Sequence, residues 1–529
     1  MQHTCQALGG MVVAPHHLAA QAGRDVLRDG GNAVEAMVAA AATIAVVYPQ
    51  MNSIGGDGFW LVHRPGQAPW AIDASGPSAA LADRAFYAGQ SSIPPRGPRA
   101  ALSVAGTVSG WRLALRHAGS WPGRPMPLDR LLRDAIGHAR QGIVVSSSQA
   151  ELTRTKLEGL RGVHGFAEVF LPGGQAPRAG DILRQGALAD TLEHLARHGL
   201  DAFYRGSLGA AIGDELERIG SPLRKADLLT YQAEEVEPLR LRLGDCTLYN
   251  LPPSTQGLAS LLILGVFEQL GVGEGEGFAH LHGLIESTKQ AFRVRNRVVT
   301  DRGRLPEDPQ GLLHPDRLAA LAARIDGERA LPWPEPAAPG DTIWMGAVDR
   351  DGCAVSFIQS TYWEFGSGVV LRDTGITWQN RGISFSLDPG DLNTLEPGRK
   401  PFHTLNPALA LFDDGRSMPY GTMGGEGQPQ TQAAVFTRYA RFGMALQQAV
   451  DAPRWLLGRT WGDVSTTLKL ESRFDPRLVQ RLREAGHDVE LLEQAYSDTM
   501  GHAGALVRHP DGRIEGAADP RSDGAAAGV

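Results

Sequence analysis

Apolar residues recur at three- and four-residue intervals through much of the first half of the chain, a spacing that predicts amphipathic helices. One helix is expected at residues 17–28, ended by the glycine pair at 30–31. Asn32 then begins a second helix, because Glu35 follows three positions later and can complete a capping box. Residues 33–47 are almost entirely apolar but too short to cross a bilayer, so they predict a buried helix. Further helices are expected at 188–198, 258–271 and 279–298.

The pattern changes at residues 326–341, where sixteen positions hold four prolines and two glycines. Proline fixes φ and removes a backbone donor, so this stretch is expected to run over the surface, as a domain linker does. Strands are predicted at 343–348 and 354–360, joined into a hairpin by a turn at 349–352. Residues 404–412 and 416–423 extend the β-rich part, and helices are expected again at 430–450 and 477–485.

The hairpin gives Thr342 a neighbour. If Asp349 pairs with Cys353 around a three-residue connection, Thr342 lies opposite Ser360. A four-residue connection would place it opposite Gln359 instead. The first register brings two hydroxyl groups together at one end of the hairpin.

A second candidate feature is the glycine-rich segment at residues 421–427, Gly-Thr-Met-Gly-Gly-Glu-Gly. Consecutive backbone N–H groups without side chains can stabilise a developing oxyanion. Paired glycines also form ordinary tight turns, so the residues alone leave both interpretations open.

Composition narrows the class of protein. The chain has 529 residues, 42% of them hydrophobic and 21% charged, which is typical of a folded globular protein. The formal net charge of −7 argues against nucleic acid or an anionic membrane as a partner. The length alone suggests three or four domains. The arginines between 293 and 304 alternate with Val, Asn and Asp, which predicts a solvated helix face.

The three cysteines, at positions 5, 246 and 353, form neither a C-x-x-C pair nor an even set for disulfides, which favours a reducing compartment. The N-terminal residues lack the features of a secretory signal, so a cytoplasmic protein is expected. The sequence carries none of the common zinc-, phosphate- or dinucleotide-binding motifs, and we expect neither a cofactor nor a metal.

Five segments together resemble signatures of the γ-glutamyltranspeptidase family, and they occur in family order across nearly the whole chain. They are Gly-Gly-Asn-Ala-Val-Glu-Ala at 30–36, Gly-Gly-Asp-Gly-Phe at 55–59, Ala-Gly-Thr-Val-Ser-Gly-Trp at 105–111, Asp-Thr at 341–342 with Val-Asp-Arg-Asp-Gly at 348–352, and Asp-Pro-Arg-Ser at 519–522. The resemblance implies a four-layered αββα N-terminal-nucleophile hydrolase, made as one precursor and cut between Asp341 and Thr342. Residues 1–341 would form a large subunit and residues 342–529 a small one, interlocked in one fold.

The resemblance also implies roles for the residues singled out above. Thr342 would be the nucleophile, and its own α-amino group, exposed by cleavage, would be the base. Ser360 takes the place of a threonine whose hydroxyl supports the nucleophile, although a strand-end serine can also only satisfy backbone groups. Gly424 and Gly425 take the place of the diglycine oxyanion hole.

The chain departs from the family pattern where γ-glutamyl enzymes grip their substrate. The arginine expected after Ala-Ile-Asp at 71–73 is missing, and the acidic pair aligns with Ile-Ser at 383–384. The paired serines align with His403 and Thr404, and an asparagine aligns with Tyr362. Losing these partners would leave a glutamyl group's charges unpaired, at a cost of several kcal/mol. Glutathione is therefore a poor candidate substrate.

The residues expected near the nucleophile are bulky and partly basic: Tyr362, Trp363, Trp378, Arg381 and His403. Thr404, next to His403, is a further candidate for substrate binding. They predict a small anionic substrate, with Arg381 or His403 holding its carboxylate. Each also has a plainer interpretation, as a core aromatic, an ion-pair partner or a structural histidine. Several segments resemble family members that hydrolyse oxamate to oxalate and ammonia in purine breakdown; they lie at 363–368, 378–382, 401–407 and 424–430.

Three alternatives stay open. Two keep the reaction class but change the acyl group: a γ-glutamyltransferase or glutathione hydrolase, and a cephalosporin (glutaryl) acylase. The third is a non-catalytic scaffold that retains the fold. The partners implied by the leading hypothesis are a small anionic amide and the chain's own two fragments as a heterodimer, with a dimer of heterodimers also open.

Overall fold

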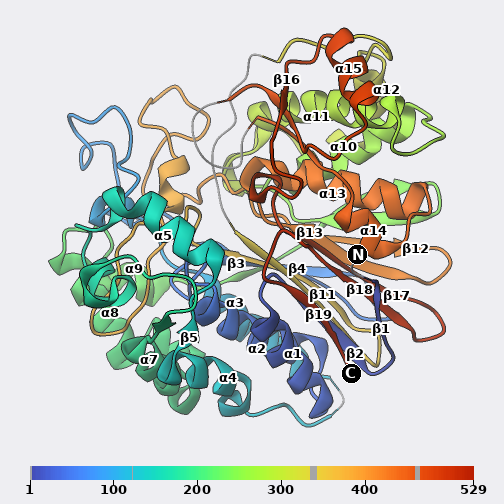
Figure 1. Ribbon diagram of the computed structural model, residues 1–529. Helices are drawn as coiled ribbons and strands as arrows, with labels where there is room; N and C mark the ends of the chain where they lie inside the picture. The colour runs from blue at the N-terminus through green and yellow to red at the C-terminus, as the bar shows by residue number, and fades with distance from the viewer. Residues whose placement is uncertain (1–2, 122, 334–341, 459–464) are drawn as a thin grey trace.

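Two seven-stranded sheets lie face to face, and helices cover the outer face of each (Figure 1). The computed structural model describes residues 3–121, 123–333, 342–458 and 465–529. The result is a four-layered αββα sandwich, the architecture that the resemblance implied.

The first sheet holds the predicted hairpin near its centre and is antiparallel throughout. Every residue of the two hairpin strands is buried, because one face packs on helices and the other on the second sheet. Its strands, in spatial order, are β19 (Ala525–Gly528), β2 (Gly10–Ala14), β10 (Ile343–Asp349), β11 (Ala354–Ser360), β3 (Asp57–His63), β4 (Trp70–Ala74) and β7 (Glu234–Val236).

The second sheet is likewise antiparallel. Its strands, in spatial order, are β1 (Cys5–Ala7), β18 (Ile514–Ala518), β17 (Ala503–Arg508), β13 (Ser417–Thr422), β12 (Ala408–Phe412), β9 (Cys246–Asn250) and β8 (Leu239–Leu243). Large apolar side chains fill the space between the sheets, among them Phe59, Trp344, Ile358, Leu409 and Leu506.

Helices from the first half of the chain cover the first sheet. All fifteen residues of the helix after Asn32 are buried, and the predicted capping box is present: Asn32 Oδ1 accepts from the Glu35 backbone, while Glu35 Oε2 accepts from the Asn32 backbone. The layer contains α1 (His17–Arg28), α2 (Ala33–Val47), α3 (Thr107–Ala118), α4 (Leu128–Gln141), α5 (Ser147–Leu160), α6 (Phe166–Phe170), α7 (Gly186–His198), α8 (Gly206–Arg218) and α9 (Lys225–Thr230).

Helices from both sides of residue 342 cover the second sheet. They are α10 (Gly257–Gln269), α11 (Phe278–Val298), α12 (Pro315–Ala322), α13 (Gln428–Phe436), α14 (Leu446–Asp451) and α15 (Pro476–Glu484). Two small sheets complete the described secondary structure: β14 (Trp455–Leu457), β15 (Leu468–Leu470) and β16 (Val489–Leu491) in one, β5 (Ile143–Val144) and β6 (Ile182–Leu183) in the other.

The three or four domains suggested by length are wrong. Both sheets contain strands from before and after residue 342: β2 lies between β19 and β10 in the first sheet, and β1 and β9 flank the block from β18 to β12 in the second. Because each sheet needs both parts of the chain, the proline-rich stretch does not separate independent domains.

Two element predictions need correction. The expected helix at 430–450 is divided: α13 ends at Phe436, a wide helical turn covers 437–441, and α14 begins at Leu446. Gly443, at φ 67°, lies between them in a conformation that no right-handed helix contains. The strand expected from 404 begins only at Ala408, because the Thr404 carbonyl is bonded to side chains, those of Gln256 and Asn406.

No helix in the described ranges has both the length and the apolar character needed to cross a membrane.

Candidate active site

Three strand ends bring Thr342, Ser360 and Asp57 side by side. In the β10–β11 hairpin Ile343 lies opposite Gln359, and the Asp349 N–H donates to the Cys353 carbonyl at 3.1 Å, so the connection has three residues. Continuing that register by one position puts Thr342 opposite Ser360. Ser360 in turn lies opposite Asp57 across β11 and β3. Neighbouring strands are about 4.8 Å apart, so the three residues form a row at one end of the sheet.

Both hydroxyl residues in this row are buried, Thr342 at 1% and Ser360 at 2% exposure. Ser360 Oγ accepts a hydrogen bond of 2.8 Å from the backbone N–H of Tyr362. Tyr362 has φ 82°, a left-handed conformation that is costly for a side chain of this size. Ser360 therefore helps to hold the sharp turn by which the chain leaves β11.

Asp57 is completely buried and bonded through both oxygens. Oδ1 accepts from the Gly76 N–H and from Gln379 Nε2, each at 3.0 Å, and Oδ2 lies 3.0 Å from His403 Nε2. Burial raises the pKa of Asp57 to about 7. Burial, reinforced by Arg381 and Lys400, holds the pKa of His403 well below its usual value. Both shifts favour a neutral histidine.

Arg381 is a buried cation whose side-chain partners among the described residues are Thr404 and Tyr362. It begins a short 3-10 helix, Arg381–Ser384, and is 1% exposed. Its Nη1 donates to Thr404 Oγ1 at 3.2 Å, and its Cζ lies 3.3 Å from the centre of the Tyr362 ring. Nε and Nη2 have no hydrogen-bond partner, and no carboxylate of the described residues pairs with the guanidinium. Burial lowers the pKa of Arg381.

The glycine-rich segment joins β13 to α13. Gly424 has φ 119° and Gly425 φ 52°, and Gly425 begins the 3-10 turn that leads into the helix. Backbone N–H groups at a helix start attract negative charge. Among the described residues, none accepts a hydrogen bond from the Gly424 or Gly425 N–H.

Gln256, which no sequence motif singles out, connects two parts of the site. Its Nε2 donates to the carbonyls of Gly425 and Thr404, each at 2.8 Å. Arg295 supports it from α11: Nη1 donates to Gln256 Oε1 at 3.0 Å, and Nη2 lies 3.0 Å from Glu426 Oε2.

The solvated helix face predicted for the arginines between 293 and 304 is therefore wrong for Arg295, which is 4% exposed. The helical spacing could have predicted the burial of Arg295, because Phe292 and Val298, three positions to either side, lie on the same helix face and are buried as well.

The predicted residues fall into connected groups. Thr342 and Ser360 are neighbours by register, while Tyr362, Arg381 and Thr404 contact one another directly or through the guanidinium. His403 is paired with Asp57, for which the sequence suggested no role. Asp341 lies outside the described residues.

Comparison of the chain with known proteins identifies its family. Residues 19–529 match the family model described as Gamma-glutamyltranspeptidase. The chain belongs to the γ-glutamyltranspeptidase family. It is 57% identical to the oxamate amidohydrolase proenzyme of Klebsiella pneumoniae over 519 residues, which cover 98% of each chain. It is 40% identical to the glutathione hydrolase-like YwrD proenzyme of Bacillus subtilis over 522 residues, again 98% of each.

Among solved structures, the cephalosporin acylase of Bacillus halodurans matches with a TM-score of 0.91 and 33% sequence identity, covering all of this chain and 97% of that one. The sandwich is thus the N-terminal-nucleophile hydrolase fold that the γ-glutamyltranspeptidase family shares.

Proposed function

We propose that the chain is a self-processing threonine amidohydrolase whose substrate is oxamate. The observation that supports this substrate assignment is the buried guanidinium of Arg381, whose Nε and Nη2 have no hydrogen-bond partner. The site lacks the family's glutamyl clamp, and the 57% identity to an oxamate amidohydrolase proenzyme supports the same assignment.

Processing would occur between Asp341 and Thr342. Thr342 Oγ attacks the Asp341 carbonyl carbon, and the C–N bond breaks, so that Asp341 becomes an ester on Oγ and the Thr342 nitrogen becomes a free amine. Water then hydrolyses the ester. The products are a large subunit of residues 1–341, ending in a carboxylate, and a small subunit of residues 342–529, with a free hydroxyl beside a free α-amino group.

The same two groups would then hydrolyse the substrate. The α-amino group takes the proton of Thr342 Oγ as Oγ attacks the amide carbon of oxamate. The resulting oxyanion accepts hydrogen bonds from the Gly424 and Gly425 N–H groups, each worth about 3 kcal/mol in the transition state. Ammonia leaves with the proton from the α-ammonium group, and water releases oxalate from the acyl-enzyme.

The carboxylate of oxamate is bonded directly to the reacting carbon, so its partner must lie close to the nucleophile. Arg381 Nε and Nη2 offer the paired donors that a carboxylate accepts best. His403 is the weaker of the two predicted anchors, because its Nε2 is committed to Asp57 and burial keeps it neutral. Thr404 then acts through Arg381, whose Nη1 it binds, rather than on the substrate.

A glutaryl or γ-glutamyl acyl group remains the second candidate, supported by the fold match to a cephalosporin acylase. Its terminal carboxylate stands several bonds from the scissile amide, so it would need an anchor farther from Thr342 than oxamate does.

The decisive experiment measures ammonia and oxalate released from oxamate by the fully cleaved enzyme, beside γ-glutamyl-p-nitroanilide and glutaryl-7-aminocephalosporanic acid. We expect turnover of oxamate to exceed that of both. A cleaved enzyme that is inert on oxamate but active on either competitor would replace this substrate assignment. An uncut, inactive chain would favour the scaffold interpretation.

A further inference from the structure

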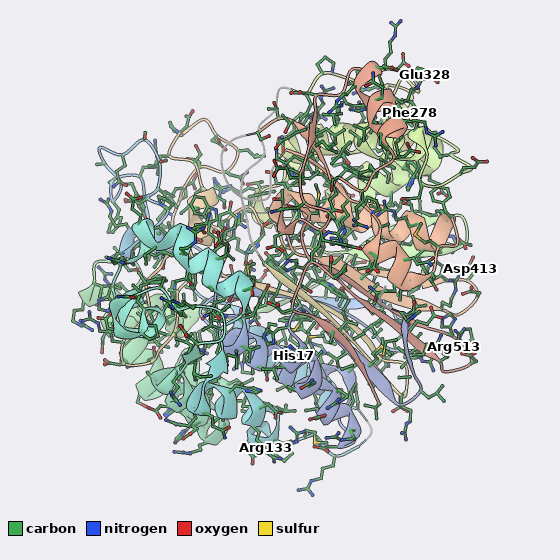
Figure 2. All side chains as sticks on the ribbon, in the orientation of Figure 1. His17, Arg133, Phe278, Glu328, Asp413 and Arg513 are labelled. Atoms are coloured by element: carbon green, nitrogen blue, oxygen red, sulfur yellow. The ribbon has the colours of Figure 1, made fainter. Side chains whose placement is uncertain are left out.

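Asp57 and His403 form a buried pair on the same side of the first sheet as the proposed nucleophile. Residues directly opposite each other in an antiparallel sheet point to the same side, so Thr342, Ser360 and Asp57 do so. Phe59, two positions after Asp57, points into the layer between the two sheets, where side chains fill the interior (Figure 2). The pair therefore lies in the layer that Thr342 faces.

His403 is held on several sides, and one of its ring nitrogens is unused. Its backbone N–H donates to the Ser254 carbonyl at 2.8 Å, its carbonyl accepts from the Gln256 N–H at 2.9 Å, and its ring packs edge-on against Phe59. Nε2 lies 3.0 Å from Asp57 Oδ2. Nδ1 is buried and has no hydrogen-bond partner among the described residues. Because a buried polar atom without a partner costs free energy, Nδ1 is a position that a ligand can satisfy.

Asp57 determines which ring nitrogen of His403 carries the proton. Its Oδ1 accepts from the Gly76 N–H and from Gln379 Nε2, each at 3.0 Å, and from the Gly106 N–H at 3.3 Å. An oxygen surrounded by three donors carries no proton of its own. Above the pKa of about 7 to which burial raises Asp57, Oδ2 is an acceptor too, so Nε2 donates to it. The ring is neutral, which leaves Nδ1 as a bare acceptor.

A primary amide beside a carboxylate needs an acceptor as well as donors. In oxamate the carboxylate and the amide oxygen accept hydrogen bonds, whereas the NH2 group donates them. The groups proposed above for the first two, Arg381 and the N–H groups of Gly424 and Gly425, are all donors. Thr404, the residue after His403, binds Arg381 Nη1 at 3.2 Å. The free acceptor of His403 therefore lies in the same buried region as the proposed carboxylate anchor.

We propose that His403 Nδ1 accepts a hydrogen bond from the amide nitrogen of the substrate, and that Asp57 is the positioning residue that keeps Nδ1 unprotonated. An NH2 group satisfies this acceptor, whereas an ester oxygen, or the new carboxylate oxygen of oxalate, sets lone pairs against each other. The contact thus selects a primary amide and favours release of the product. The proton that the leaving nitrogen gains still comes from the α-ammonium group. The inference rests on the proposed hydrolysis of oxamate.

Asp57→Asn tests the assignment with little change of shape. The three donors at Oδ1 require the Asn oxygen there, so the Asn NH2 group donates to His403 Nε2 and the ring proton moves to Nδ1. At pH 8.5, kcat/KM for oxamate should fall about a hundredfold or more, whereas that for monomethyl oxalate, which has the same acyl group but no N–H, should not fall. Oxalate should inhibit the variant about threefold or more strongly, because Nδ1 now donates. Equal losses for amide and ester would overturn the proposal.

Removing a negative charge by itself strengthens the binding of an anion, so Asp73→Asn is the matched control. Asp73 is also a buried carboxylate of the first sheet, but it bonds to Ser75 and Lys400 rather than to His403. Its amide-to-ester ratio of kcat/KM should stay within about twofold of the wild type. Equal shifts in the two variants would identify a charge effect and contradict the proposal.

His403→Leu is the second test, in case Asp57→Asn does not fold. It removes Nδ1 altogether, so the amide-to-ester ratio should fall about tenfold or more, without the stronger inhibition by oxalate. An unchanged ratio would exclude His403 as the acceptor. A cleaved wild-type enzyme that hydrolyses neither oxamate nor monomethyl oxalate would instead refute the proposed function itself.

Discussion

The guanidinium carbon of Arg381 lies 3.3 Å from the centre of the Tyr362 ring, and Tyr362 holds this position from a left-handed backbone conformation. Backbone strain of this kind costs about 1–3 kcal/mol and persists only where the surrounding structure enforces it. Here Ser360 Oγ binds the Tyr362 N–H. The strain places an aromatic face against a buried cation, which leaves the other guanidinium donors available.

Replacing Arg381 should separate substrate binding from self-cleavage. In Arg381→Gln we expect kcat/KM for oxamate to fall about a hundredfold or more, because a paired charge-assisted contact is lost, while the chain is still cut. The wild type should strongly prefer oxamate over its neutral ethyl ester, and the variant should lose that preference. Arg372→Gln, which removes an exposed ion pair with Glu168, is the matched control. An undiminished preference in Arg381→Gln would exclude Arg381 as the anchor.

Removing the hydroxyl of Thr342 should abolish both proposed reactions. Thr342→Ala is expected to give a single uncut chain without amidase activity, whereas Thr342→Ser, which keeps a hydroxyl, should still be cut, though more slowly. For the wild type, N-terminal sequencing of the smaller fragment should begin Thr342-Ile343-Trp344. A Thr342→Ala protein that is cut and active would show that Thr342 is not the nucleophile of either reaction.

Gln256 should affect the rate of the chemical step more than substrate binding. Gln256→Met keeps the length of the side chain but removes the donor to the Gly425 carbonyl and leaves the Thr404 carbonyl with Asn406 alone. We expect kcat for oxamate to fall roughly tenfold or more as the oxyanion loop loses its support, with a smaller change in KM. Gln67→Met, in an exposed turn, serves for comparison. A change confined to KM would mean that Gln256 acts on substrate binding instead.

Asp519 should make stability depend on pH in the acid range. Burial alone would raise the pKa of this carboxyl, but Arg454 and Arg521 together lower it to about 2. A folded-state pKa below the unfolded value gives stability that is present above about pH 4 and is lost as the pH falls toward 2. The shift corresponds to about 2 kcal/mol.

Urea unfolding of Asp519→Asn in the uncut Thr342→Ala background should therefore show a large loss of unfolding free energy at pH 7 and a loss smaller by about 1 kcal/mol at pH 3, which lies midway between the folded and unfolded pKa values. Asp413→Asn, at an exposed pair with Arg242, should leave the unfolding free energy nearly unchanged at either pH, because solvent screens the pair. A loss for Asp519→Asn that is equal at both pH values would show that packing, not charge, explains its effect.

Local patterns predicted the hairpin but left two registers open, and the structure has the three-residue connection that places Thr342 opposite Ser360. The capping box at Asn32 and Glu35 was likewise confirmed. The sequence did not predict contacts between distant segments. Asp57 meets His403 across 346 positions, and Gln256 meets Gly425 across 169. Such contacts form only when the two sheets stack, so they cannot be predicted from residue spacing or residue type.

Because each sheet contains strands from both sides of residue 342, the sheets also determine how the two fragments can separate. After the proposed cut, β2 and β3 of one polypeptide still bond to β10 and β11 of the other, and β1 and β9 bond to β18 and β12. The fragments could separate only by opening both sheets at once, so unfolding should be a single concerted event. Reassembly would then require two separate polypeptides to form both sheets together, whereas the intact precursor folds as a single chain. The mature protein is therefore expected to fold once in its lifetime, before it is cut.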